Sequence, residues 1–254
     1  MEYKKVLLLS FFLLINQLLR SQEYKFIPDL KVRYEFVFQS DSTDTKSKKS
    51  EIMNLYLTKD KSVFESDAKY KYDSIVSSYA KITPSSNLIV NFDAIQKPQI
   101  WISIFKNFNN NELIYSDKIM KYKLFYQSNI DNIKWKILPE NKVILGYKCR
   151  KATCYFGGRN YIAWYSEKIV IPNGPYKFNG LPGLILSIAD TNDQFSFNAI
   201  AISKHKNQEI TINVKNYIKT TREKYFSDKV KIIKGLGKNG RSPIINLNPI
   251  EKSY

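Results

Sequence analysis

Alternation of apolar and polar residues is the strongest pattern in this chain, and it predicts β-strands. Between residues 30 and 39, Leu30, Val32, Tyr34, Phe36 and Phe38 occupy every second position, which is the period of a strand with one buried face. Short apolar or alternating runs continue at small intervals, bounded by Asn, Asp, Gly and Pro. They predict further strands over residues 52–57, 62–65, 100–106, 112–117, 119–127, 133–138, 143–156, 161–169, 184–189, 195–203 and 209–215.

Two segments have helical rather than strand spacing. Residues 68–81 carry an apolar stripe of Tyr72, Ile75, Val76 and Tyr79 after the capping candidates Ser66 and Asp67. Residues 221–234 follow a possible capping box of Thr220 and Glu223, and Gly235 suits the end of the helix. With no alternation of strands and helices, the pattern predicts a mainly β fold. We expect a curved antiparallel sheet or partial barrel with one or two covering helices.

A turn rich in glycine and proline separates two of the predicted strands, 161–169 and 184–189. Within Leu181-Pro182-Gly183-Leu184, proline presets the backbone and glycine accepts a positive φ, so we expect a type II turn. Gly180 lacks a Cβ and lets another backbone or an aromatic ring approach closely. The turn motif as a whole comprises Gly174, Pro175, Gly180, Leu181, Pro182, Gly183, Leu184 and Ile185.

The run Gly180-Leu-Pro-Gly-Leu-Ile185, with Gly174, Pro175 and Phe178 before it, resembles the signature of the GLPGLI family. The upstream pattern from Gly146 to Tyr165 is similar to that family as well. These are exported proteins of diderm bacteria without an assigned activity. The resemblance therefore implies a compartment and a kind of fold, but no reaction.

The two ends of the chain are expected to lie outside the folded domain. Lys4 and Lys5 precede an apolar run over residues 6–15 that is too short to span a membrane. We interpret residues 1–21 as a signal peptide, 22–234 as one β-rich domain and 235–254 as a mobile C-terminal tail. No cysteine lies near the expected cleavage point, so the prediction is export to the periplasm or beyond, not as a lipoprotein. We expect no transmembrane segment in the mature chain.

The formal charge of +17 changes the picture only slightly. The lysines are spread along the chain, so we interpret the charge as solvated surface with a general attraction to anionic glycolipid or polysaccharide, and not as a nucleic-acid site. Cys149 and Cys154 are too far apart on one extended strand for a disulfide, and we expect both thiols to be free and mostly buried.

Recognisable catalytic and metal-binding patterns are missing from the sequence. His205 is the only histidine and its neighbours are lysines, which argues against a triad or a zinc site. We therefore predict no catalytic residue, no metal and no cofactor. The remaining candidates for binding a ligand are aromatic or charged residues around the turn: Arg159, Trp164, Glu167, Tyr176 and Phe178.

Three functions stay open at this point. The first is a non-enzymatic envelope protein that binds an apolar or extended ligand, such as a lipid or a peptide, on its curved sheet, by analogy with lipoprotein carriers. The second is a structural or adaptor protein that binds another envelope protein. The third is a hydrolase built on Glu167 with Asp190 or Asp193, which requires two carboxyl groups about 5 to 9.5 Å apart.

Overall fold

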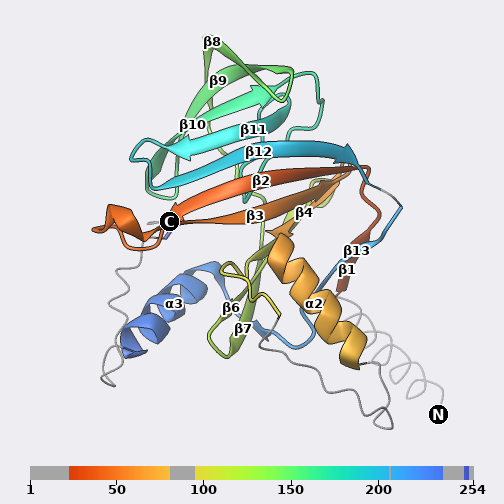
Figure 1. The fold of residues 1–254 in the computed structure, drawn as a ribbon, viewed down its shortest axis with the longest axis vertical. Helices are drawn as coiled ribbons and strands as arrows, with labels where there is room; N and C mark the ends of the chain where they lie inside the picture. Colours follow the sequence, from red (N-terminus) through yellow and green to blue (C-terminus); the bar gives the residue numbers. More distant parts are fainter. Residues whose placement is uncertain (1–22, 81–94, 206, 237–248, 252–254) are drawn as a thin grey trace, which may run out of the picture.

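The fold is a deep, curved β-sheet with one helix outside it and one at its mouth (Figure 1). The computed structural model describes residues 23–80, 95–205, 207–236 and 249–251. Twelve strands of this part of the chain form one continuous sheet, and two more form a small separate sheet. Neighbouring strands are antiparallel, except for one parallel pair at an edge, so the predicted mainly β fold with a curved sheet and two helices is confirmed.

The strands of the large sheet follow one another in an order that begins and ends at open edges. From one edge to the other they are β14 (Ile218–Lys219), β7 (Tyr122–Ser128), β6 (Glu112–Ile119), β5 (Ser103–Asn107), β4 (Lys61–Ser66), β3 (Lys48–Leu57), β2 (Leu30–Gln39), β12 (Phe195–Lys204), β11 (Leu184–Asp190), β10 (Arg159–Ser166), β9 (Tyr147–Phe156) and β8 (Lys136–Ile144). The small sheet pairs β1 (Glu23–Phe26) with β13 (Ile210–Asn213). A short 3-10 helix, Thr45–Ser47, precedes β3.

The sheet encloses the main core on its concave side. Val32, Tyr34 and Phe36 of β2 are buried there, as their alternation predicts. Much of strands β3 to β7 is buried on both faces, because the β1–β13 pair covers their outer side through a second core that contains Phe105 and Ile212. Double burial explains why these strands are apolar at consecutive positions.

Two-residue hairpins with positive φ angles join several strands. Gly157 and Gly158 have φ angles of 55° and 79° and connect β9 to β10, as the sequence predicts. Leu145 and Gly146, at 50° and 80°, form a second such turn between β8 and β9. The prediction of one long strand over 143–156 is therefore wrong, because this turn divides it. β8 also contains Pro139, which an edge strand with an irregular register tolerates.

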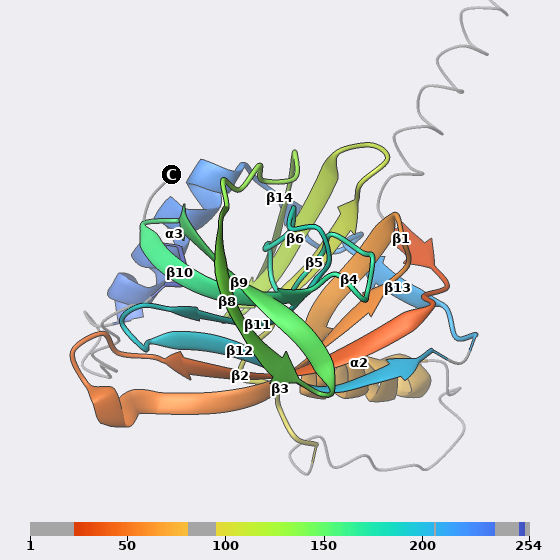
Figure 2. The same cartoon turned by 90° about the horizontal axis from the view of Figure 1, so that it is seen from above.

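The two helices lie on different sides of the sheet (Figure 2). The helix α2 (Asp67–Ala80) contacts β3 and β4 from outside, and its Lys69 amide donates to the Ser66 hydroxyl, which caps the helix. The helix α3 (Arg222–Leu236) places Tyr225 in the main core. Its cap is Thr221 rather than Thr220, and it continues past Gly235. α3 therefore covers the mouth of the bowl and α2 does not, so one of the two helices predicted as candidate covers has that role.

The segment between β10 and β11 descends into the bowl and fills it (Figure 2). Tyr176, Phe178 and Leu181 are buried in the main core. Gly183 has a φ of 154°, and a Cβ there would lie 2.2 Å from the Ser166 carbonyl oxygen. The Leu184 amide donates to Ile169 instead of Leu181, so the predicted type II turn is wrong. The backbone kinks at Gly183 because Ser166 approaches too closely for any side chain.

Some sequence predictions concern the chain ends. The predicted signal peptide lies outside the described residues. Of the predicted tail, Gly235 and Leu236 belong to α3, and Pro249–Glu251 dock onto the body of the domain, with Glu251 only 2% exposed. Both cysteines are free and buried, as predicted. Among the described residues, no helix has the length and hydropathy to cross a membrane.

Candidate functional site

The candidate residues from the sequence do not meet in one open site. Tyr176 and Phe178 pack as neighbours, with ring centroids 6.3 Å apart, but both are buried beneath the mouth of the bowl. Trp164 is half-buried, and the Lys142 ammonium lies 4.6 Å from its ring. Arg159 is buried and pairs with Asp190 at 2.9 Å. These contacts place the residues in separate structural roles.

The carboxylates of the hydrolase hypothesis are also separated. Glu167 is exposed and pairs with Arg150 at 3.2 Å. Asp190 is buried against Arg159, and its other oxygen accepts from the amides of the turn before β12. Asp193 is exposed and pairs with Lys48 at 2.6 Å. Each carboxylate therefore serves a different ion pair.

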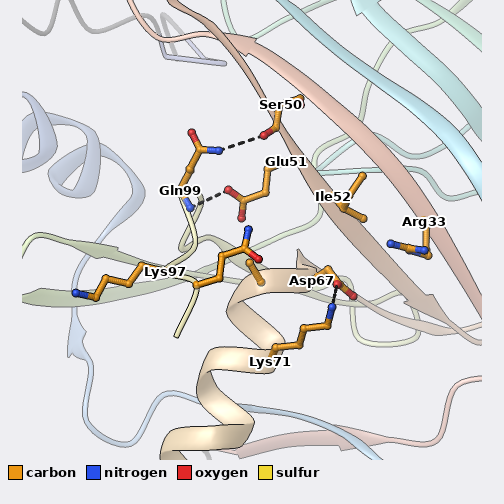
Figure 3. A pocket seen from close by; sticks show the side chains of 10 residues that line it. Arg33, Ser50, Glu51, Ile52, Asp67, Lys71, Lys97 and Gln99 are labelled. Carbon is orange, nitrogen blue, oxygen red and sulfur yellow. Dashed lines mark hydrogen bonds and ion pairs between the residues drawn. The ribbon is translucent and has the colours of Figure 1, made fainter. Parts of the chain in front are cut away.

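A polar pocket lies where β4 ends and α2 begins, and the sequence reading did not identify it (Figure 3). Its volume is about 350 Å³, and its walls come from β2, β3, the first turns of α2 and the segment 96–99. Most of the lining side chains carry charges or amides. They include Arg33, Glu51, Asp67, Lys71, Lys97 and Gln99.

Glu51 holds one wall of this pocket in place. One carboxylate oxygen accepts from the Ser66 hydroxyl, and the other accepts from the amides of Gln99 and Ile100 at 2.8 and 3.1 Å. Burial raises the pKa of Glu51, although these three hydrogen bonds oppose the shift. Because both oxygens are engaged, Glu51 shapes the pocket and fastens the 99–100 segment to β3.

Asp67 keeps a negative charge at the start of α2. Burial by itself would raise the pKa of Asp67, but the hydrogen bond from Asn54 and the Lys71 ammonium outweigh it and lower the pKa. The Lys71 ammonium lies 2.8 Å from the Asp67 carboxylate (Figure 3). The positive end of the helix dipole adds to this preference for the ionised form.

Arg33 has a hydrogen-bond donor that the described residues leave unused. It projects from β2 toward the pocket (Figure 3). Its Nε atom is buried and finds no partner among the described residues. Guanidinium donors, carboxylates and amides that converge on one hollow can bind a ligand rich in hydroxyl groups, because each group can donate to or accept from vicinal oxygens.

Sequence reasoning missed this pocket because its residues are far apart in the chain. One signal was present: the alternation in β2 assigns Lys31, Arg33 and Glu35 to the face opposite Tyr34. The pattern shows that this face is polar, but not that α2 and the segment 96–99 close a pocket around Arg33.

A second hollow, of about 650 Å³, opens between α3 and the inner faces of β2 and β12. Its walls are largely apolar and include Phe36, Phe195 and Phe226, with the docked residues Pro249–Glu251 on one side. Within the described residues, no group of three or more His, Cys, Asp or Glu side chains is placed to hold a metal ion.

Comparison with known proteins identifies relatives of this chain. Residues 37–226 match the family described as N-glycanase peptide, N-terminal domain. Two solved structures share the fold, titled "Structure of PNGF-II in C2 space group" and "Structure of PNGF-II in P21 space group". Both are 14% identical over 84% of this chain, with TM-scores of 0.54 and 0.55. The matched region spans 33% and 34% of those chains, and none of the curated proteins matches.

These comparisons overturn three predictions. The resemblance to the GLPGLI family is wrong, since the family that matches is that of the N-glycanase domain. The prediction of an envelope protein that binds an apolar or extended ligand is also wrong, as is its envelope-adaptor alternative, because the match is to an N-glycanase domain. The hydrolase alternative is only loosely related to that family. The prediction that the protein is not an enzyme is contradicted as well, because the matching family is that of an N-glycanase. The Gly-Pro turn motif led to the wrong family because it reflects a backbone kink. Proteins with different functions can need the same kink, so the motif does not identify a function.

Proposed function

From the premise that this chain belongs to the family of N-glycanase peptide N-terminal domains, we propose that it functions in the processing of N-linked glycans. In this proposal the domain binds the glycan-bearing substrate through the polar pocket around Arg33. The family match is the observation that carries the proposal, and it covers most of the sheet, all of α2 and the first turn of α3.

The chemistry of the pocket supports a carbohydrate ligand. Sugars offer many hydroxyl groups at fixed spacing, and each hydroxyl can both donate and accept a hydrogen bond. Arg33, Lys71 and Lys97 supply donors, and Gln99 supplies an amide oxygen as acceptor, since its amide nitrogen donates to Ser50. Asp67, which already accepts from Asn54 and Lys71, contributes negative charge. A volume of about 350 Å³ suits one or two sugar rings rather than a whole glycan. We therefore expect the pocket to bind a terminal part of the glycan.

Binding of a glycopeptide by the full chain tests this proposal. We expect a peptide with one N-linked glycan to bind, and the same peptide without the glycan to show no binding in calorimetry. Arg33→Ala should weaken binding at least tenfold, because it removes a planar group of five donors from the pocket. The matched control is Arg150→Ala, which removes an exposed arginine from β9 and should leave binding unchanged.

The outcome against the proposal is equally specific. Equal affinity for the glycosylated and bare peptides would remove the glycan from the interaction. Equal loss in Arg33→Ala and Arg150→Ala would show that general charge, and not the pocket, attracts the peptide. In parallel, mass spectrometry of a glycoprotein incubated with the chain would show whether the domain also releases the glycan.

A further inference from the structure

Pro249–Glu251 are held by the body of the domain in the manner of a bound peptide. Arg159 donates from Nε and Nη2 to the Pro249 carbonyl oxygen, at 3.2 and 2.9 Å. The Tyr161 hydroxyl donates to the Ile250 carbonyl oxygen at 3.1 Å. Two successive main-chain carbonyl groups are therefore bound by side chains from β10.

The acidic side chain of this segment enters a site of its own. The Glu251 carboxylate lies 2.5 Å from the Lys177 ammonium and 2.9 Å from the Arg222 guanidinium, and it accepts from the Tyr176 hydroxyl. The Lys177 side chain is 0% exposed and that of Arg222 is 18% exposed. A buried carboxylate with two cationic partners and a hydroxyl donor is recognised by charge and by geometry.

The two arginines of the site are oriented by other side chains of the domain, and not by Pro249–Glu251. Arg159 is oriented by Asp190 and Gln194, at 2.9 and 2.7 Å. Arg222 is oriented in the same way by Asp131, at 2.6 Å. The hairpin glycine Gly157 also fits the segment closely, since a Cβ there would lie 2.8 to 3.0 Å from atoms of Glu251.

We propose that these residues form a binding site for an acidic peptide segment, and that the chain's own Pro249–Glu251 occupies it in this structure. The occupant is a short peptide that offers two carbonyl groups followed by a glutamate side chain. The site is separate from the polar pocket and goes beyond the proposed binding of glycans. Because the occupant is covalently linked, its effective concentration is of millimolar order, and a free peptide must compete with it.

Binding of a labelled synthetic peptide with the sequence of residues 247–254 tests the proposal. In the full-length variant Glu251→Gln, the resident segment loses its charge and should yield the site. We expect this variant to bind the peptide at least tenfold more tightly than the wild-type chain does. A peptide with Gln in place of Glu should not bind. A folded variant that binds neither peptide, or both equally, overturns the proposal.

Hydrogen exchange decides the question even if Glu251→Gln fails to fold. In the wild-type chain the amides of Ile250 and Glu251 should be protected, and millimolar Glu peptide should accelerate their exchange while the Gln peptide does not. Gly157→Asn, which keeps the positive φ of the turn but adds a Cβ against Glu251, should abolish the protection. Gly146→Asn is the matched control, because nothing lies within 4 Å of a Cβ there. Unprotected amides in the wild-type chain, or no response to the Glu peptide, overturn the proposal.

Discussion

Two lysines, Lys106 and Lys177, are completely buried inside the bowl, and their surroundings are opposite in kind. Lys106 projects from β5, and within the described part of the chain its ammonium donates to neutral oxygens: Asn173 Oδ1 at 2.5 Å, and the carbonyl oxygens of Gly174 and Phe178 at 3.3 Å. Lys177 belongs to the segment that Lys106 holds, and it pairs with a carboxylate. Both lysines are therefore equally buried. They differ in the groups that offset the cost of burying the ammonium: neutral oxygens around Lys106 and a carboxylate beside Lys177.

Aromatic rings complete the surroundings of Lys177. Its ammonium lies 5.1 Å from the ring centroid of Tyr115, 5.5 Å from those of Tyr126 and Tyr176, and 5.6 Å from that of Phe226. Ring faces attract a cation without supplying a formal charge. Lys177 thus links the segment between β10 and β11 to α3 and to Glu251. Lys106, in contrast, holds that segment against β5. Lys106 therefore stabilises one turn, whereas Lys177 joins parts of the chain that are distant in the sequence.

Replacing Lys177 should have the largest effect on stability. Lys177→Met leaves the buried Glu251 carboxylate with the Arg222 guanidinium at 2.9 Å. We expect a loss of about 3 kcal/mol in the free energy of unfolding, because breaking a buried ion pair exposes its desolvation cost. Urea denaturation followed by circular dichroism measures this loss.

The double variant Lys177→Met, Glu251→Gln sharpens this prediction. It removes both charges, so it should be more stable than the sum of the two single effects implies, with a coupling energy of about 2 kcal/mol. Additive losses would show that Lys177 and Glu251 stabilise the fold independently of each other.

Replacing Lys106 should cost less. Lys106→Met removes a donor from three oxygens, but it also removes a charge buried without a carboxylate partner at contact distance. Asn173 Oδ1 keeps a hydrogen bond from the Gly174 amide at 2.8 Å. We expect a net loss of about 1 to 2 kcal/mol, measured by the same denaturation. A loss as large as that of Lys177→Met would contradict the distinction between the two sites.

Local patterns in the sequence predicted much of the fold, because they depend on neighbouring residues. Alternation in β2 and the glycines at 157 and 158 specify a strand and a hairpin within a few positions. The hairpin at Leu145 and Gly146 was missed because leucine rarely adopts a φ of 50°. Because its apolar side chain resembles a strand position, the sequence pattern predicted a single strand where β8 and β9 meet.

The candidate sites were beyond such reasoning for a physical reason. Glu251 is one acidic residue in a polar stretch, and its partners Lys177 and Arg222 lie far away in the sequence. Arg33 was assigned to the correct kind of face, but its pocket needs α2 and the segment 96–99. The role of a charged residue depends on the groups that the fold places beside it. The periodicity of apolar residues along the sequence does not show which groups these are.

The pH dependence of the free energy of unfolding tests whether Lys106, which lacks a carboxylate partner at contact distance among the described residues, loses its proton in the folded chain. Burial lowers the pKa of Lys106 to about 7, from an ordinary value of 10.5. Between these values the unfolded chain binds a proton that the folded chain has released, so the free energy of unfolding rises with pH. From pH 7 to pH 8 the rise should be about 1 kcal/mol in the wild-type chain. It should be smaller by that amount in Lys106→Met, in which every other titrating group is retained. Identical pH profiles of the two proteins would show that the carbonyl oxygens keep Lys106 charged in the folded state throughout this range.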